Sequence, residues 1–455
     1  MMKSMTLKAI AKACGGTYYG PSCNLEKEVS GIAIDSRKIE AGWLFAATIG
    51  ERVDGHSFIE SCYSKGALCC LGEKAPADED HSYIQVSSTF QAMKDIAEYY
   101  RSTLKIPVVG ITGSVGKTST KEMIASVLGV KYNTLKTAGN FNNEVGLPLT
   151  VFHIRKEHEA AVLEMGISDF GEMHRLSKIA RPDICVMTNI GLCHLEFLCD
   201  RDGVLKAKSE IFDFAAENAK AIVNGDDDKL HTLKSRKDLD VTLFGMNASN
   251  DVYAKNVENL GLDGLKCEIS TPAGDFGAHI HIPGMHMVYN ALAGTCVGLA
   301  CGLTLEEIKT GIENAQTISG RNNIIHTEKY TIMDDCYNAN PISMKASLDV
   351  LSTALGRKVA ILGDMGELGA DEAALHYTVG EHAAKKQIDL LLCVGTLSEE
   401  IAKGAKAVNP KMNAHVFAAK EELLAKLPEL LSTGDSILIK ASHFMQFEKI
   451  VTALQ

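Results

Sequence analysis

The sequence predicts an α/β protein with three domains, and three observations support this prediction. First, 455 residues are too many for one ordinary domain. Second, short apolar segments suited to buried strands alternate with segments suited to helices, which is typical of parallel sheets covered by helices. Third, a glycine-rich loop follows one of these strands and precedes a helix. We place the domains at residues 1–85, 86–315 and 316–455.

The first segment, residues 1–85, is predicted to be a small α/β domain. We expect helices at 7–14 and 57–65, and short strands at 31–34 and 43–47. At the start of the chain, lysines alternate with short apolar pieces and no continuous hydrophobic region forms. We therefore expect neither a signal peptide nor a membrane anchor.

The second and third segments each predict a sheet with its own helices. In the second we expect a mostly parallel sheet, with strands at 108–112, 160–164, 184–188 and 221–224 and helices at 171–179 and 204–217. In the third, the same alternation of strands and helices predicts a Rossmann-like unit with strands at 331–334, 358–362, 389–394 and 436–440.

Composition excludes several function classes. The net charge is −11 and no cluster of lysine and arginine stands out, so nucleic acid is not an expected partner. No apolar run approaches the length of a membrane span. The thirteen cysteines form no CxxC pair, and most lie in apolar runs. Free thiols in a reducing compartment explain them best, and we expect a cytoplasmic protein.

The most informative segment surrounds Lys117. Residues 106–112 predict a buried strand, 113–118 (Gly-Ser-Val-Gly-Lys-Thr) a phosphate-binding loop, and 119–128 a helix. In such a loop, backbone N–H groups close on phosphate oxygens, the lysine reaches the terminal phosphates, and the threonine hydroxyl serves Mg²⁺. The standard GxxxxGK(S/T) spacing is missed by one residue. The strand–loop–helix context nevertheless predicts binding of ATP or GTP.

Polar residues at other strand ends are candidates for the same site, because the carboxyl ends of parallel strands meet at one edge of a sheet. Glu164 ends one predicted strand and His194 follows another, and both suit Mg²⁺ or Mn²⁺. The alternatives are a turn carboxylate and a structural histidine. Lys206 and Lys208 lie in a predicted helix, where solvated lysines are the usual case.

Two amide-rich segments and one arginine complete the candidate site. Residues 136–144 hold three asparagines in a glycine-punctuated turn, which indicates either a substrate loop or a cluster of Asx turns. Residues 333–341 (MDDCYNANP) likewise end a strand with acidic and amide side chains. Arg321 lies at the junction of the second and third segments, from which it could reach phosphates across a domain cleft. Residues 363–367 are a further acidic turn, which could belong to the same cleft.

These segments together resemble the Mur ligases of bacterial cell-wall synthesis over the whole chain. The phosphate loop fits the family form TGSxGKT(S/T), which accounts for its unusual spacing. The other matching segments are DSR (35–37), DGHxF (54–58), TxGNFNNExGxPL (137–149), EMG (164–166), TNIGxxH (188–194), KAKxEIF (206–212), DDxYNANP (334–341) and LGDMxELG (362–369). The segments GNFNNE and YNANP resemble one branch of the family in particular.

The resemblance implies a two-stage, ATP-dependent amide synthesis with Mg²⁺. In the implied branch, UDP-N-acetylmuramoyl-tripeptide and D-Ala-D-Ala are the substrates, and a carboxylate of the first forms an acyl phosphate that the amine of the second attacks. It also implies an N-terminal UDP-binding domain, a central P-loop ATPase domain and a C-terminal Rossmann-like domain. We expect a monomer.

The resemblance also implies roles for individual residues. The catalytic group comprises Lys117, Glu164, His194 and Lys208. ATP binding is expected of Gly113, Ser114, Val115, Gly116, Lys117, Thr118, Ser119, Asn290, Arg321 and Asp335. Substrate binding is expected of Ser30, Asp35, Ser36, Arg37, Thr137, Asn140, Asn142, Asn143, Tyr337, Asn338 and Asn340. The metal ligands would be Thr118, Glu164, His194 and, if it carries CO₂ as a carbamate, Lys208.

Alternatives and departures accompany this interpretation. Another Mur-type ligase, a folylpolyglutamate synthase and a non-catalytic P-loop regulator are the competing functions. Ile342 stands where the family commonly has aspartate, residues 440–443 read KASH where KGSR is usual, and residues 167–170 replace a turn rich in asparagine and histidine. These departures concern the D-Ala-D-Ala pocket. Whether the third peptide residue is lysine or another diamino acid is left open.

Overall fold

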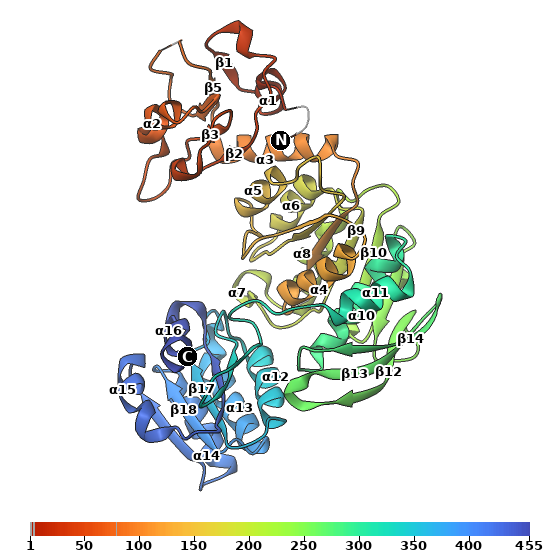
Figure 1. Ribbon diagram of the computed structural model, residues 1–455, viewed down its shortest axis with the longest axis vertical. Helices are drawn as coiled ribbons and strands as arrows, with labels where there is room; N and C mark the ends of the chain where they lie inside the picture. The colour runs from red at the N-terminus through yellow and green to blue at the C-terminus, as the bar shows by residue number, and fades with distance from the viewer. Residues whose placement is uncertain (1, 3–4, 79) are drawn as a thin grey trace.

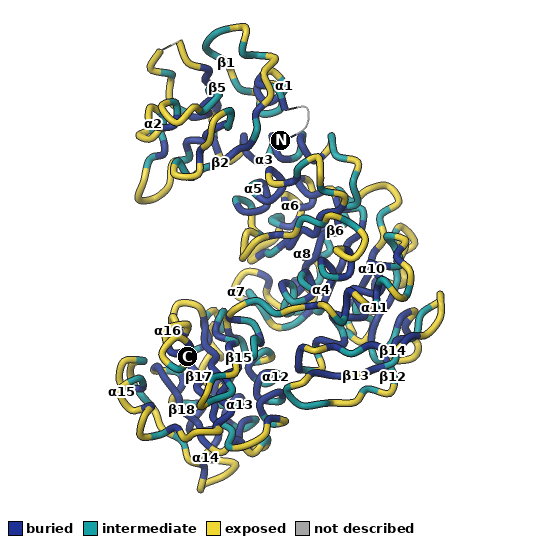
Figure 2. The backbone as a smooth tube through the Cα atoms, in the orientation of Figure 1, coloured by how far each residue is buried: buried dark blue, intermediate teal, exposed yellow. Residues whose placement is uncertain are grey.

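The computed structural model describes residues 2, 5–78 and 80–455, and these form three α/β domains in chain order (Figure 1). Each domain has its own sheet, of five, nine and six strands. Figure 2 shows that the strands at the centre of each sheet are largely buried, whereas exposed residues concentrate in loops and on outer helix faces. The predicted α/β class is confirmed. The exact domain boundaries stay a prediction.

The first sheet has the order β1-β5-β4-β3-β2 and is parallel except for the β1–β5 pair. Its elements are α1 (Leu7–Ala13), β1 (Thr17–Tyr19), β2 (Ile32–Ala33), β3 (Leu44–Ala46), α2 (Ile59–Ser64), β4 (Cys69–Gly72) and β5 (Tyr83–Gln85). Both predicted helices and both predicted strands are present. The other three strands were not predicted.

Helix α3 (Thr89–Thr103) joins the first domain to the second. Ser88 caps it by accepting a hydrogen bond from the Gln91 N–H. Its buried face, which includes Ile96 and Tyr100, belongs to one hydrophobic core that runs from the first sheet into the central domain. The first domain is therefore attached through a shared core as well as through the chain.

The central sheet has the order β14-β13-β12-β11-β10-β9-β6-β8-β7. Its strands are β6 (Val108–Thr112), β7 (Thr134–Lys136), β8 (Ala160–Glu164), β9 (Ile184–Met187), β10 (Lys220–Asn224), β11 (Asp240–Gly245), β12 (Val252–Asn259), β13 (Leu265–Thr271) and β14 (Gly274–Ile280). Across the sheet, every neighbouring pair between β12 and β7 is parallel. At the other end, β13 and β14 pair antiparallel and form the edge beyond β12. The mostly parallel sheet is confirmed, but the antiparallel edge was not predicted.

Helices cover both faces of this sheet. They are α4 (Lys117–Gly129), α5 (Gly146–Phe152), α6 (Glu172–Ala180), α7 (Leu195–Leu198), α8 (Arg201–Ser209), α9 (Asp228–His231), α10 (His286–Ala300) and α11 (Leu305–Glu313). The prediction of one helix over 204–217 was wrong, because α8 ends at Ser209 and a single 3₁₀ turn, Glu210–Phe212, follows. Beyond it, the N–H of Phe214 donates to Ser177 Oγ and that of Ala216 to the Pro182 carbonyl. These tertiary hydrogen bonds replace the helical ones.

The third sheet has the order β15-β16-β20-β17-β18-β19, with β15 its only antiparallel strand. Its strands are β15 (Asn323–His326), β16 (Thr331–Asp334), β17 (Lys358–Gly363), β18 (Leu390–Val394), β19 (Asn413–Phe417) and β20 (Ser436–Lys440). The helices are α12 (Pro341–Ser352), α13 (Glu372–Lys385), α14 (Ser398–Val408), α15 (Lys420–Leu430) and α16 (Glu448–Leu454). All four predicted strands are present in this Rossmann-like unit.

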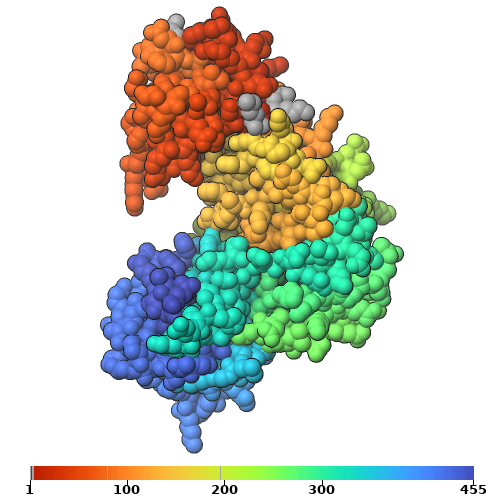
Figure 3. Space-filling model, in the orientation of Figure 1, coloured from red at the N-terminus to blue at the C-terminus, as the bar shows by residue number. Residues whose placement is uncertain are grey.

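The three domains form an open arc in which the central domain holds the other two apart (Figures 1 and 3). The space-filling view shows a notch between the first and third domains, with the central domain as its floor. All thirteen cysteines are free thiols. Among the helices of the described residues, none is both long and apolar enough to cross a membrane.

Helix α4, which follows the phosphate loop, packs tightly against α11 through Gly311. A Cβ atom at Gly311 would lie 2.4 Å from Val127 Cα and 3.0 Å from the Ser126 carbonyl oxygen. These are backbone atoms, so they cannot move aside as a side-chain tip could. Glycine at this position therefore sets how closely the two helices approach.

We expect Gly311→Ala to lower the thermal stability of the central domain, although alanine normally favours a helix by about 1 kcal/mol over glycine. The clash should cost about 1–3 kcal/mol, which outweighs that gain. The matched control is Gly129→Ala at the end of α4, where an added Cβ meets no atom within 4 Å. Calorimetry should show a lower transition temperature only for Gly311→Ala. An unchanged or raised value there would contradict the close approach.

Candidate active site

A cavity of about 600 Å³ opens between the central and third domains at the carboxyl end of the central sheet. The structure brings most of the predicted nucleotide and substrate residues into its wall. These are Ser114, Val115, Gly116, Lys117, Thr118, Ser119, Asn140, Asn142, Glu164, Asn290, Arg321, Asp335, Tyr337, Asn338 and Asn340. The convergence of distant segments on one cavity makes it the candidate active site.

The phosphate loop connects β6 to α4 and is shaped by a close approach at Gly113. This residue has φ +152°, and an added Cβ would lie 1.9 Å from Thr188 Oγ1, so the loop requires glycine there. Lys117 begins α4, and its ammonium donates a 2.8 Å hydrogen bond to the Gly113 carbonyl. Burial lowers the pKa of Lys117, and the nearby Glu164 carboxylate opposes that shift.

The segment after β9 holds the phosphate loop from the side. The N–H of Ser114 donates to the Asn189 carbonyl (3.0 Å), and the N–H of Val115 donates to Asn189 Oδ1 (2.9 Å). Thr188 Oγ1 donates to the Val115 carbonyl at 2.7 Å. Asn189 was not singled out from the sequence. Its position directly after a parallel strand was the signal that could have found it.

Glu164, at the end of β8, has the environment of a metal ligand. Only 2% of it is exposed, and its Oε1 accepts hydrogen bonds from Asn142 Nδ2 (2.8 Å) and Thr118 Oγ1 (3.2 Å). Its Oε2 is buried without a hydrogen-bond partner, and Lys121 Nζ lies 3.8 Å away. A free carboxylate oxygen beside a threonine hydroxyl fits a hard cation such as Mg²⁺. Lys121 was not predicted.

Lys208 and His194 lie close to the cavity without lining it. Lys208, on α8, is 1% exposed, and its ammonium makes no hydrogen bond or ion pair with any described residue. Burial, followed by repulsion from Lys117, lowers the pKa of Lys208 to about 7. Burial likewise lowers the pKa of His194, whose Nδ1 lies 3.8 Å from Glu367 of the third domain.

The third domain contributes an arginine and a largely buried ion pair to the cavity wall. The Arg321 guanidinium lies 4.0 Å from the centre of the Tyr337 ring, a cation–π contact. Lys440 Nζ lies 2.6 Å from Asp335 Oδ2, which also accepts a hydrogen bond from Ser347 Oγ, while Oδ1 accepts one from the Asn322 N–H. Both Asp335 oxygens therefore hold the loops of this domain together.

Several lining residues were not predicted. Asn224 is the last residue of β10 and Phe244 the last but one of β11, so the strand-end rule could have identified them. His286 and Tyr289 come from α10, and no local pattern in the sequence distinguished them. The Tyr289 hydroxyl donates to Asp226 Oδ2 at 3.1 Å, and Asn290 Oδ1 accepts from Thr120 Oγ1 at 2.8 Å.

Other predicted site residues lie outside the cavity wall. Thr137 and Asn143 accept backbone hydrogen bonds, from the N–H of Glu164 (3.0 Å) and of Gly146 (2.9 Å) respectively. Ser30, Asp35, Ser36 and Arg37 lie in the first domain, where Asp35 pairs with an exposed Arg37 at 2.9 Å. This Arg37 hydrogen bond lowers the pKa of Asp35 to about 2. The structure thus separates the predicted UDP-binding residues from the predicted ATP-binding residues.

Family models match most of the chain. The model described as Mur ligase family, catalytic domain, matches residues 28–110, the Mur ligase middle domain matches 111–298, and the Mur ligase, glutamate ligase domain, matches 320–443. A protein of Bacillus subtilis (strain 168) named UDP-N-acetylmuramoyl-tripeptide–D-alanyl-D-alanine ligase is 37% identical over 458 aligned positions, which cover 100% of this chain and 99% of that protein.

Solved structures agree with the sequence relatives. MurF from Acinetobacter baumannii superposes with a TM-score of 0.90 at 33% identity, covering 99% of this chain and 98% of that chain. MurF ligase from Thermotoga maritima in complex with ADP superposes with a TM-score of 0.81 at 29% identity, covering 93% and 96%. On this evidence from the sequence and the fold together, the chain belongs to the Mur ligase family.

Proposed function

We propose that this chain uses ATP to join D-Ala-D-Ala to UDP-N-acetylmuramoyl-tripeptide. The observation that carries the proposal is the single cavity in which the phosphate loop, the buried Glu164 and the amide-rich turns of two domains meet. The full-length relative from Bacillus subtilis, whose name states this reaction, supports the same substrates over a folylpolyglutamate synthase or a non-catalytic regulator.

In the first stage, a carboxylate oxygen of the tripeptide attacks the γ-phosphorus of ATP. A new O–P bond forms, the bond between that phosphorus and the bridging oxygen breaks, and ADP leaves an acyl phosphate behind. Such a transfer needs in-line positioning and neutralisation of charge more than covalent participation by the protein. Lys117 supplies a cation at the phosphate loop, and Arg321 supplies a second from the third domain.

The residues present fit a bound Mg²⁺. Thr118, Glu164 and His194 would hold it, with Lys208 as a further ligand if it is carbamylated. When bound, the ion would neutralise charge on the phosphates. The partnerless Oε2 of Glu164 is the feature of this chain that most directly supports such a ligand.

In the second stage, the amine of D-Ala-D-Ala attacks the acyl carbon, inorganic phosphate leaves, and the nitrogen loses a proton. Acyl phosphates also react with water, so the cavity must exclude it. The turn that carries Tyr337, Asn338 and Asn340 lies on the third domain, as does Ile342, and all four residues line the cavity. Approach of this domain would complete the D-Ala-D-Ala pocket and remove water.

The notch between the first and third domains suits a long substrate (Figure 3). Ser30 and residues 35–37 would hold its UDP end, and Asn140 and Asn142 would face its central part. We further propose that the protein works as a monomer in the cytoplasm, a location that its free thiols support.

Lys208 is proposed to carry CO₂ as a carbamate. An ammonium buried beside Lys117 is repelled, whereas a carbamate is an anion that can bind or orient a cation. The reaction needs a neutral amine, and the lowered pKa of Lys208, about 7, supplies one near neutral pH. No hydrogen bond or ion pair to the described residues holds the amine in its protonated form, although the residue is only 1% exposed.

The reaction predicts ADP release that depends on both UDP-N-acetylmuramoyl-tripeptide and D-Ala-D-Ala, with none from folate plus glutamate. Lys117→Ala should keep the fold and reduce this release by about a thousandfold, because the cation at the transferred phosphoryl group is lost. Lys105→Ala, at an exposed lysine before β6, serves as the control. Near-wild-type release from folded Lys117→Ala would refute the phosphate-loop assignment. A panel of tripeptides would identify the third residue.

Arg321→Ala should impair the use of ATP and leave binding of the UDP-sugar peptide unchanged, because Arg321 lies in the cavity and far from the first domain. We expect kcat/KM for ATP to fall by about tenfold or more. The control is Arg236→Ala, which breaks a surface pair with Asp238. Titration calorimetry then measures the affinity for the UDP-sugar peptide. An equal loss of affinity for ATP and for this peptide would contradict the prediction that Arg321 serves ATP alone.

Lys208→Ala should remove most of the activity, by about a hundredfold or more, and acetate or formate should restore part of it. Lys206→Ala is the matched control, since Lys206 is exposed on the same helix. Carbon-13 NMR after exposure to labelled CO₂ should show one carbamate signal that Lys208→Ala lacks. Loss of activity without rescue and without that signal would reject the carbamate, although Lys208 would remain essential.

A further inference from the structure

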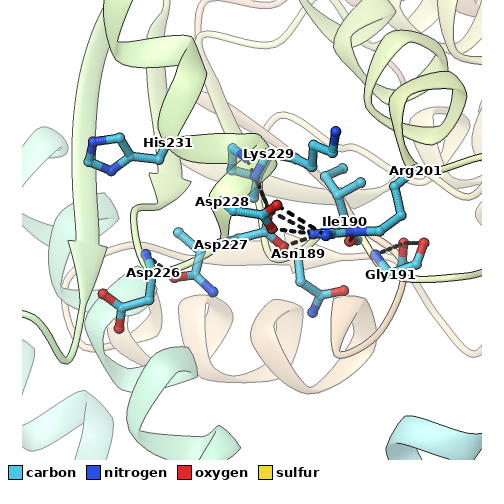
Figure 4. A network of polar contacts seen from close by, with 12 residues as sticks. Asn189, Ile190, Gly191, Arg201, Asp226, Asp227, Asp228, Lys229 and His231 are labelled. Carbon is cyan, nitrogen blue, oxygen red and sulfur yellow. Dashed lines mark hydrogen bonds and ion pairs between the residues drawn. The ribbon is translucent and has the colours of Figure 1, made fainter.

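The backbone of Ile190, beside the phosphate loop, is held by an ion pair (Figure 4). The N–H of Ile190 donates to Asp227 Oδ2 at 2.8 Å, and the carbonyl of Ile190 accepts from Arg201 Nε at 2.8 Å. Arg201 Nη2 and Asp227 Oδ1 are 3.7 Å apart, so the two side chains also attract each other. Both backbone polar groups of Ile190 are thereby fixed by charged partners, which make the stronger hydrogen bonds.

Both carboxylate oxygens of Asp227 accept hydrogen bonds. Its Oδ1 accepts the N–H groups of Lys229 and Leu230, both at 3.0 Å, and so caps α9. Only 9% of its side chain is exposed. A carboxylate can serve both Ile190 and the helix because it has two acceptor oxygens, whereas an amide has one.

Ile190 immediately follows Asn189, the residue that holds the phosphate loop, and the Ile190 N–H shares a peptide unit with the Asn189 carbonyl. Asn189 accepts the N–H groups of Ser114 and Val115. A continuous series of hydrogen bonds therefore runs from Asp227 through Ile190 and Asn189 to the loop. Arg201 begins α8, the helix that carries Lys208, so the same ion pair ties that helix to the loop.

We propose that Asp227 and Arg201 are positioning residues for ATP. They fix the backbone of Ile190, and through Asn189 they hold the backbone of the phosphate loop in its nucleotide-binding shape. Neither side chain lines the cavity. Their effect on nucleotide affinity is thus indirect, and it should leave the UDP-sugar site in the first domain untouched.

Asp227→Asn tests this role with almost no change in shape. If the amide oxygen continues to cap α9, its NH₂ group faces the Ile190 N–H, and two donors meet. We expect the Kd for ADP, measured by titration calorimetry with Mg²⁺ present, to rise about tenfold, as for loss of a buried charged hydrogen bond. KM for ATP should rise similarly, while the Kd for UDP-N-acetylmuramoyl-tripeptide stays unchanged.

Asp238→Asn is the control, because it removes the same charge from an exposed ion pair elsewhere in the central domain. Asp238 pairs with Arg236, and 62% of its side chain is exposed. Its ADP affinity should equal that of the wild type. Arg201→Lys keeps the positive charge and removes the Nε–H that Ile190 accepts, so it should also weaken ADP binding. If Asp227→Asn does not fold, ADP binding by Arg201→Lys tests the positioning role instead.

The results of these binding measurements distinguish failure of the proposed function from failure of the positioning role. Because this role presupposes the ATP binding proposed above, a wild-type protein that binds no ADP would overturn the proposed function itself. If the wild type binds ADP and folded Asp227→Asn or Arg201→Lys binds it equally well, the positioning role is wrong, even if the melting temperature falls. Equal weakening in Asp238→Asn would also overturn it, because loss of charge alone would then explain the effect.

Discussion

The site depends on how the phosphate loop is held between neighbouring parallel strands. β6 lies between β8 and β9, with Ile111 opposite Glu164 and Thr112 opposite Met187. This register places the carboxylate of Glu164 on one side of the loop and the Thr188–Asn189 segment on the other. Since the loop itself has little regular structure, these two neighbours provide much of its support.

Three lysines lie in and beside the cavity. Lys117 lines the cavity, Lys121 lies 3.8 Å from Glu164, and Lys208 repels Lys117. The pKa values of Lys117 and Lys208 are lowered mainly by burial. Buried like charges are unfavourable unless an anion joins them. A polyphosphate, a substrate carboxylate and a carbamate are all anions. The same electrostatic demand therefore connects the binding of ATP, the acyl phosphate and the proposed modification of Lys208.

The third domain contributes to this site through loops that are themselves tied together. The buried Lys440 pairs with the partly buried Asp335, whose carboxylate also accepts a hydrogen bond from the Asn322 N–H. Asn322 Nδ2 in turn donates to the Pro283 carbonyl of the central domain at 2.6 Å. Arg321 lies directly beside this connection. Its guanidinium packs over the ring of Tyr337, which also lines the cavity.

The sequence alone was sufficient to predict the elements whose pattern is local. The phosphate loop with its strand and helix, the mostly parallel central sheet and the strand ends at Glu164 and Asp334 follow from apolar runs and glycine positions. The predicted helix over 204–217 failed because Phe214 and Ala216 find tertiary partners, which no periodicity reveals. The antiparallel edge strands were missed for a similar reason, since their pairing lies outside the alternation of strand and helix.

Only the tertiary structure decided which of the candidate side chains meet. Thr137 and Asn143 satisfy backbone groups, whereas the neighbouring Asn140 and Asn142 reach the cavity. Asn189, Tyr289 and His286 also line the site, although none of these three residues was singled out from the sequence. The physical reason is that a sequence pattern fixes which face a residue occupies within its own element. The hydrogen-bond partner it finally obtains depends on how distant elements pack.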